Sequence, residues 1–214
     1  MIKLWGRKNA YNVQKVLWTL HELKFDYIHH DVGSVPVDLE TEEFLSRNPH
    51  ARIPVISDNN ELIWESNTII RYLASSYSHG NLWNTDPVKR SRADRWMDWE
   101  LATLQPDFID LFWSYYRTPQ DQHDLTAIGT SKKHCESHFQ KLDQHLENNK
   151  YLAGDSFTMG DIPCATGLYR YLTMGLDVEQ PPHVLAWYKR LSQRKAFQQC
   201  IVVPYDELKG RIQF

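Results

Sequence analysis

The sequence predicts an α/β part with the element order βαβ-α-ββα, followed by an all-helical part. Three observations carry this prediction. Short runs with strand-like alternation flank a helical stripe in the first 77 residues, and two further strands follow a proline. Beyond residue 87, apolar residues recur at helical spacing only. We therefore expect a domain at 1–77, a linker at 78–87 and a helical bundle domain at 88–214.

The first elements follow from the spacing of apolar residues. Met1–Trp5 alternates and predicts a strand, and a helix is expected to begin at Tyr11. Phe25–Asp31 predicts a second strand. A short helix is expected over Leu39–Arg47, because the pair that follows, Asn48-Pro49, disfavours its continuation. The stripe of the first helix consists of Val13, Val16, Leu17, Leu20 and Leu23.

The stretch from Arg52 to Leu73 predicts two strands, Ile53–Ser57 and Glu61–Trp64, and a helix from about Ser66. Pro54 removes a ladder donor, which leaves neighbouring backbone groups free to pair with an extended ligand. A helix N-terminus near Ser66 offers unpaired N–H groups to a carboxylate. The adjacent Glu65 can pair with an ammonium group. Together these two residues predict a receptor for an amino-acid head group.

The second part begins after Ser78–Pro87, which breaks the periodicity. Val88–Arg117 predicts one long amphipathic helix with a kink at Pro106. Further helices are expected over Asp121–Asn148, after Thr158, and over His183–Arg194. Thr158 and Asp161 have the spacing of a reciprocal helix cap, and we expect them to be structural.

Composition excludes several classes of function. The chain is 42% hydrophobic and 24% charged, and its formal net charge is -3. This gives no support for nucleic-acid binding, and no run is apolar enough to predict a signal peptide or a membrane span. The three cysteines, Cys135, Cys164 and Cys200, lack CxxC or zinc spacing. We expect reduced thiols, no metal site and a cytoplasmic protein.

The order of the first elements is that of a thioredoxin-like fold, and the motifs IPV and WESNTIIRYL resemble the glutathione-binding domain of the cytosolic glutathione transferases. Bacterial members of the theta, nu and beta types are the most similar. The resemblance covers essentially the whole chain and implies glutathione as co-substrate. It implies a cis peptide at Pro54, cysteinyl binding by the backbone of Ile53 and Pro54, and a place for Arg52 near the glycine carboxylate. It also assigns Glu65 and Ser66 to the γ-glutamyl group.

The thiol-activating residue is where the chain departs from the family. Family members resembling the theta and beta types carry Ser or Cys at a position that is Ala10 here, and alanine has no side-chain donor. Asn12 is the proposed thiol contact, although it could instead cap the helix. Tyr11 is the second catalytic candidate, although it could instead be a packing aromatic. Conjugation is therefore expected to be weak, or shifted towards disulfide or peroxide reduction.

The pocket for the second substrate is less specified. Tyr11, Phe108 and Tyr205 are the expected wall residues, with the hydrophobic core as the alternative for Phe108. The resemblance also implies a homodimer. Its interface is expected around Trp96 and Trp99, for which a solvated face is the alternative. The flanking charges are Arg92, Asp94, Arg95 and Asp98.

The expected function is that of a glutathione S-transferase that activates the glutathione thiol for attack on small apolar electrophiles. Two alternatives remain open. The first is a glutathione-dependent disulfide reductase or peroxidase, which the pairing of Ala10 with Asn12 favours. The second is a non-catalytic interaction module with a transferase-like fold. The presence of Pro54, Glu65 and Ser66 favours glutathione binding in either enzyme.

Overall fold

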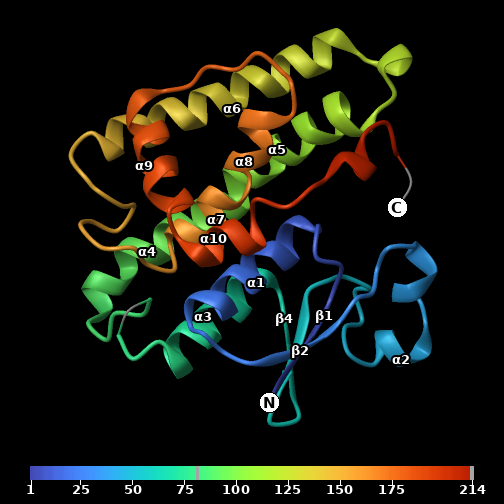
Figure 1. Cartoon of the computed structure of the whole chain (residues 1–214), viewed down its shortest axis with the longest axis vertical. Helices are drawn as coiled ribbons and strands as arrows, with labels where there is room; N and C mark the ends of the chain where they lie inside the picture. The colour runs from blue at the N-terminus through green and yellow to red at the C-terminus, as the bar shows by residue number, and fades with distance from the viewer. Residues whose placement is uncertain (81, 213–214) are drawn as a thin grey trace.

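The computed structural model describes residues 1–80 and 82–212, without the side chain of Pro36. A four-stranded sheet and its helices form one part, and the remaining helices gather on one side of it (Figure 1). This is the predicted α/β plus all-α architecture. The strands are β1 (Ile2–Trp5), β2 (Tyr27–His30), β3 (Val55–Asp58) and β4 (Glu61–Trp64).

The sheet has the strand order β2-β1-β3-β4, with β1 and β2 parallel and the other pairs antiparallel. Its register sorts side chains to two faces, because successive residues of a strand point to opposite sides. Leu4 lies opposite Ile56 on one face, and Trp5 lies opposite Val55 on the other. All four are buried, so the sheet is covered on both sides.

The two faces have different covers. Ile2, Leu4 and Ile56 join the main core with α1 (Tyr11–Glu22) and α3 (Ser66–Tyr77). Trp5 and Val55 pack with Phe44 of α2 (Glu42–Leu45) in a smaller cluster. Helix α2 is shorter than the helix predicted over residues 39–47. It begins after Thr41, whose side chain caps the helix by accepting from the Phe44 N–H at 3.2 Å. A 3₁₀ turn, Pro36–Leu39, precedes it.

The helical part begins with a single helical run from residue 87 to residue 117. It consists of α4 (Pro87–Trp99), a π-helical segment (Glu100–Leu104), α5 (Gln105–Leu111) and a second π-helical segment (Phe112–Arg117). Pro106 has no N–H to donate, which interrupts the normal hydrogen-bond ladder where the first π segment ends. The other helices are α6 (Leu125–Leu146), α7 (Asp161–Thr166), α8 (Leu168–Thr173), α9 (Pro182–Ser192) and α10 (Lys195–Cys200).

Only half of the reciprocal cap predicted for Thr158 and Asp161 is present, because the Thr158 hydroxyl accepts from the Gly160 N–H at 3.3 Å and not from the Asp161 N–H. Asp161 is fully buried and accepts hydrogen bonds from the Thr158 N–H at 2.9 Å and the Thr158 hydroxyl at 3.3 Å. It also accepts from the Leu152 N–H and the Trp187 indole, both at 3.0 Å. Burial raises the pKa of Asp161 to about 6 despite these donors. The residue ties three segments of the helical part together.

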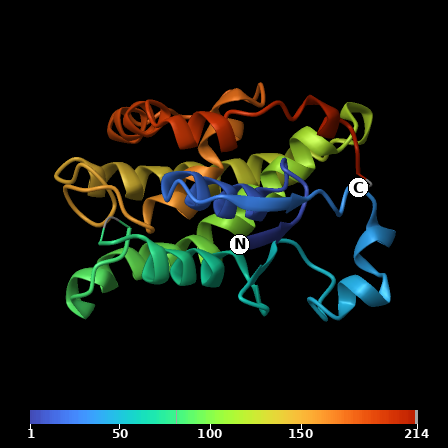
Figure 2. The same ribbon diagram turned by 60° about the horizontal axis from the view of Figure 1, so that its bottom comes forward.

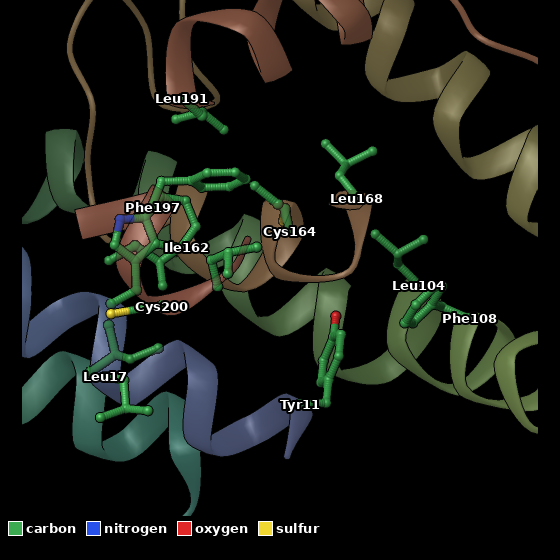
Figure 3. Packing of buried hydrophobic residues seen from close by; sticks show 14 of the residues in the cluster. Tyr11, Leu17, Leu104, Phe108, Ile162, Cys164, Leu168, Leu191, Phe197 and Cys200 are labelled. Atoms are coloured by element: carbon green, nitrogen blue, oxygen red, sulfur yellow. The ribbon is translucent and has the colours of Figure 1, made fainter. Parts of the chain in front are cut away.

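Helix α1 lies between the two parts of the fold and contacts both. It packs against α3 of its own part and against α7 and α10 of the helical part. Figure 2 shows α1 between α3 and α4 on one side and α9 and α10 on the other. Side chains from both parts merge in one apolar cluster around this helix (Figure 3). The start of α1 is therefore held from both sides.

Candidate functional site

Glu65 stands at the junction between β4 and α3. It is exposed, and its backbone has φ 68° and ψ 115°, a conformation that residues other than glycine rarely adopt. Strain of this kind collects at functional sites, where the surrounding structure enforces it. The first intrahelical bond of α3 runs from the Ile69 N–H to the Glu65 carbonyl, at 2.9 Å. The N–H groups of the preceding turn therefore lack intrahelical partners and can receive a carboxylate.

Asn12 connects this junction to the start of α1. The Ser66 hydroxyl donates to Oδ1 of Asn12 at 3.3 Å, and Ser66 is buried. This contact directs the Asn12 carbonyl towards α3 and leaves its amide nitrogen to face elsewhere. Within residues 1–80 and 82–212, that nitrogen makes no hydrogen bond with another side chain or the backbone. Asn12 thus presents a donor beside a site suited to a carboxylate and an ammonium group.

The start of α1 also lacks a side-chain cap. Ala10 is the N-cap residue and supplies no side-chain bond, and the first turn contains no acidic residue. The alternative in which Asn12 caps the helix is thereby wrong, because Asn12 is the second residue of α1. The first intrahelical bond runs from the Gln14 N–H to the Ala10 carbonyl at 2.9 Å. The uncapped N–H groups before Gln14 add a partial positive charge next to the Asn12 amide.

The loop before β3 has the geometry that the resemblance implies. The Ile53–Pro54 peptide is cis, and Pro54 is buried. Arg52 is exposed, and its backbone carbonyl accepts from the Asn48 amide at 2.9 Å, which fixes the loop that leads to Pro54. The strand begins at Val55, two residues later than predicted, because Ile53 and Pro54 lie outside the ladder. Among the described residues, none makes a hydrogen bond to the backbone of Ile53 or Pro54, and the use of these groups by a ligand stays a prediction.

Tyr11 faces the helical part. Its hydroxyl donates to Glu100 at 2.9 Å, and its side chain points away from the start of α1 (Figure 3). Lys15 lies one turn further along α1 and contacts both Glu100 oxygens, at 2.9 and 3.0 Å. Lys15 and Glu100 are both 0% exposed. Burial, and next the Glu100 charge, raise the pKa of Tyr11 well above its ordinary value. This geometry commits the Tyr11 hydroxyl to Glu100 rather than to a thiol.

The three predicted wall residues lie along one row of aromatic rings. Ring centroids of Tyr11 and Phe108 are 5.6 Å apart, and Phe112 continues the row at 6.0 Å from Phe108 and 6.0 Å from Tyr205. Tyr11, Phe108 and Tyr205 are 7%, 2% and 5% exposed. The structure thus brings them together, but it buries them in the core between the two parts. Their assignment to the second-substrate site stays a prediction.

Several polar residues at the start of α1 were not predicted. Arg170 of α8 is buried and donates to the Asn9 carbonyl at 2.5 Å and to the Gln14 side chain at 3.0 Å. The position of Lys15 beside Tyr11 could have been predicted from the sequence, because the two residues are one turn apart and share a helix face. Arg170 sits far away in the sequence, and nothing in its local pattern distinguishes it from a surface arginine.

Two cavities in the described part of the chain lie away from these residues. One, of about 520 Å³, is lined by Glu22, Tyr77 and Arg194 at the C-terminal end of α1. The other, of about 360 Å³, lies between the start of α4 and the loop before α7, next to Leu82 and Ser156. Neither has a predicted site residue in its lining. The assignment of the site to the N-terminal ends of α1 and α3 therefore rests on the contacts described above and stays a prediction.

The predicted dimer surface carries contacts within the chain. Arg71 of α3 binds Asp94 of α4 at 2.8 Å and also pairs with Asp98. Trp96 and Trp99 meet edge to face with centroids 5.4 Å apart, and both are half-buried. The ion pairs of Arg71 join α3 to α4, and the predicted interface around Trp96 and Trp99 stays a prediction.

The cysteines are buried free thiols. Burial raises the pKa of Cys164 well above its ordinary value, and it raises the pKa of Cys135 and of Cys200 to about 12. None has the exposed, electropositive surroundings of a reactive thiol. In the described part of the chain, no group of three His, Cys, Asp or Glu side chains could hold a metal ion, and no helix is long and apolar enough to cross a membrane.

Comparison with known proteins supports both parts of the architecture. The family model for the glutathione S-transferase N-terminal domain matches residues 1–75, and the model for the C-terminal domain matches residues 104–195. The chain is 37% identical to the glutathione S-transferase GstB of Escherichia coli strain K12 over 206 residues, which cover 95% of this chain and 99% of that protein. It is 32% identical to glutathione S-transferase 3 of Zea mays, over 94% of this chain and 93% of that protein.

Comparison with solved structures also finds glutathione transferases. The theta class glutathione S-transferase of Xanthomonas axonopodis pv. citri with glutathione bound superposes with a TM-score of 0.91 at 35% identity. The match covers 95% of this chain and 98% of that one. Glutathione transferase F2 of Populus trichocarpa shares the fold, with a TM-score of 0.86 at 21% identity.

Proposed function

Because the chain belongs to the glutathione S-transferase family, we propose that it binds glutathione across the N-terminal ends of α1 and α3 and uses Asn12 to activate the thiol. The chain is a glutathione S-transferase, with glutathione as its co-substrate. The observation that supports this placement most is the hydrogen bond from Ser66 to Asn12. It sets a proposed sulfur contact and a proposed head-group contact side by side.

Each end of glutathione has complementary groups in this site. The Glu65 carboxylate pairs with the α-ammonium of the γ-glutamyl group, and the Ser66 hydroxyl and the first N–H groups of α3 bind its carboxylate. The backbone around Ile53 and Pro54 pairs with the cysteinyl unit. Arg52 lies on the exposed side of this loop, within the same segment, and serves the glycine carboxylate. The structure of the Xanthomonas relative contains bound glutathione, which supports glutathione binding by this chain.

Thiol activation then needs only a donor and a positive potential. A free thiol has a pKa near 8.5, and each unit by which the site lowers it corresponds to about 1.36 kcal/mol. The Asn12 amide nitrogen donates one hydrogen bond to the sulfur. The uncapped N-terminus of α1 supplies the field. The thiolate formed in this way attacks a small electrophile, and Ala10 takes no part.

Replacing Asn12 with alanine should raise the pKa of the bound thiol by about one unit, the equivalent of one lost hydrogen bond of 1–2 kcal/mol. Ultraviolet absorbance of the thiolate, titrated with pH at saturating glutathione, measures this value. Tyr11→Phe is the matched control. It should leave the thiol pKa unchanged, because the Tyr11 hydroxyl is bound to Glu100. An unchanged pKa in Asn12→Ala, or a shift in Tyr11→Phe alone, would remove Asn12 from the mechanism.

We also propose a cytoplasmic homodimer that uses α3 and α4. The partly buried pair Trp96 and Trp99 and the exposed Arg92 and Arg95 lie on α4, next to the ion pairs of Arg71. Family membership supports this assembly.

A further inference from the structure

Arg170 is a buried arginine of α8, in the helical part of the chain, whose hydrogen bonds go to the start of α1. It is 4% exposed. Its Nη2 donates to the Asn9 carbonyl at 2.5 Å and to the Gln14 side chain at 3.0 Å. Burial lowers the pKa of Arg170 to about 10. Within residues 1–80 and 82–212 it forms no ion pair, so a buried charge is held by neutral acceptors, which costs free energy.

The two acceptors lie on either side of the first turn of α1. Asn9 precedes the N-cap residue Ala10, and the Gln14 N–H makes the first intrahelical bond, to the Ala10 carbonyl at 2.9 Å. Ala10 supplies no side-chain cap, so the N–H groups before Gln14 lack intrahelical partners. Helix ends fray. Arg170 therefore spans the turn that contains Asn12 and holds it at both ends.

Other contacts fix the guanidinium and its acceptor. The guanidinium lies 5.2 Å from the Phe112 ring centroid and 5.5 Å from the Tyr205 centroid, within the range of a cation–π contact. Gln14 is held in turn, because its amide donates to the Cys200 carbonyl at 3.0 Å. These contacts leave the Arg170 side chain little freedom, so the position of α8 determines the position of the first turn of α1.

Helix α8 can approach α1 closely because Gly167 precedes it. A Cβ on Gly167 would lie 3.1 Å from Phe108 and 3.3 Å from Tyr11. Both distances are shorter than ordinary van der Waals contact, so a larger residue here would push α8 away from Tyr11. Arg170 follows Gly167 by about one helical turn. The absence of a side chain at residue 167 therefore lets Arg170 reach the start of α1.

We propose, on the basis of the function proposed above, that Arg170 is a positioning residue for thiol activation, which holds the first turn of α1 so that the Asn12 amide points at the glutathione sulfur. Asn12 is the second residue of α1, and the Ser66 hydroxyl donates to its Oδ1 at 3.3 Å. That contact fixes one atom only, so the amide nitrogen moves when the turn moves. The head-group contacts at Glu65 lie on α3 and do not depend on this turn. Arg170 acts through Asn12 and takes no proton.

Arg170→Met tests the inference, because methionine keeps an unbranched apolar stem and removes both hydrogen bonds. Thiolate absorbance at saturating glutathione gives the pKa of the bound thiol, which should rise by about half a unit or more, part of the shift expected when the Asn12 hydrogen bond is lost. The Kd of S-methylglutathione, which has no thiol to ionise, should stay within about twofold of the wild type, because no head-group contact is lost. Arg170→Lys retains the charge and a donor and should recover part of the pKa shift.

A double-variant cycle shows whether Arg170 acts through Asn12. In the Asn12→Ala background, Arg170→Met should add no further shift to the thiol pKa, because the group that Arg170 positions is gone. Additive shifts would overturn the inference, since Arg170 would then act on the sulfur without Asn12. So would a Kd for S-methylglutathione that rises about tenfold, because Arg170 would then support the whole site rather than the thiol contact.

Arg190→Met is the matched control. Arg190 of α9 also donates to a backbone carbonyl, that of Lys150 at 2.7 Å, and it also lies near an aromatic ring, 5.8 Å from the Tyr151 centroid. Its replacement should leave the thiol pKa unchanged, because neither contact involves α1.

Folding of each variant is checked by circular dichroism. If Arg170→Met does not fold, Arg170→Lys takes its place in the same cycle, with a smaller shift expected because lysine lacks the planar fork of donors. An unchanged thiol pKa in the folded Arg170 variant, with the expected shift in Asn12→Ala, overturns this inference alone. An unchanged pKa in Asn12→Ala overturns it together with the proposed thiol contact.

Discussion

Replacing Glu65 with glutamine is expected to weaken the binding of reduced glutathione by about 10- to 100-fold, the equivalent of losing one charge-assisted hydrogen bond. The ammonium of the γ-glutamyl group then meets a neutral amide. Glutamine has nearly the same shape and can keep the strained backbone of residue 65, so the junction between β4 and α3 should persist. Calorimetric titration gives the Kd, and circular dichroism confirms the fold.

Glu61→Gln is the matched control for this experiment. Glu61 is exposed at the start of β4, four residues before Glu65, and its replacement changes the net charge by the same amount. Its Kd should equal that of the wild type. A Kd for Glu65→Gln within about twofold of the wild type, with the fold intact, would remove Glu65 from the head-group site, because a lost charged contact costs more than that.

Replacing Glu100 with leucine is expected to lower the free energy of unfolding by about 3–5 kcal/mol, because it leaves the Lys15 ammonium buried without its carboxylate. Lys15 would keep the Gln105 side chain as an acceptor, at 2.6 Å, and its contact with the Tyr11 ring, while Tyr11 would lose its acceptor. Chemical denaturation measures the loss. The double variant Lys15→Met/Glu100→Leu should recover most of it, since two apolar side chains need no partner.

The pH dependence of the free energy of unfolding provides a second test of the Lys15–Glu100 pair. Burial lowers the pKa of Lys15 in the folded protein, while the Glu100 charge raises it, so removing Glu100 lowers it further. A lysine with a depressed folded pKa binds fewer protons when folded, so its contribution to stability grows as pH rises between the folded and unfolded pKa values. The deficit of Glu100→Leu should therefore shrink towards alkaline pH. A deficit no larger than that of Arg47→Gln, which breaks an exposed pair with Glu43, would contradict this account.

Local patterns in the sequence predicted much of the fold. The stripe from Val13 to Leu20 located α1, and β4 begins and ends at the predicted residues. Neighbouring side chains such as Tyr11 and Asn12 point about 100° apart on a helix, so the burial of one places the other on a different face. The sequence proposed both as thiol contacts, because it does not show which face of α1 meets the helical part.

The part that could not be predicted consists of partners distant in the sequence. In the sequence, Lys15 is only a polar residue that interrupts an apolar stripe. Its partner Glu100 lies 85 residues later, so local spacing does not reveal the pair. Likewise, nothing near Arg170 in the sequence predicts that it donates to the Asn9 carbonyl, 161 residues away. Helix α10 was not predicted, because Arg194 and Lys195 interrupt the apolar pattern between it and α9. Such contacts depend on how two parts of the chain dock, which no local pattern encodes.

Proton release on binding tests the central claim, thiol activation between α1 and α3, most directly. Calorimetric titration with reduced glutathione near neutral pH, in two buffers of different ionisation heat, counts the protons released, and S-methylglutathione provides a ligand without a thiol. The account predicts binding of both, with proton release only for glutathione. Turnover of chlorodinitrobenzene in the same sample would indicate conjugation, and turnover of only a mixed glutathione disulfide would indicate the reductase alternative. Glutathione binding without proton release, or no binding at all, would contradict the account.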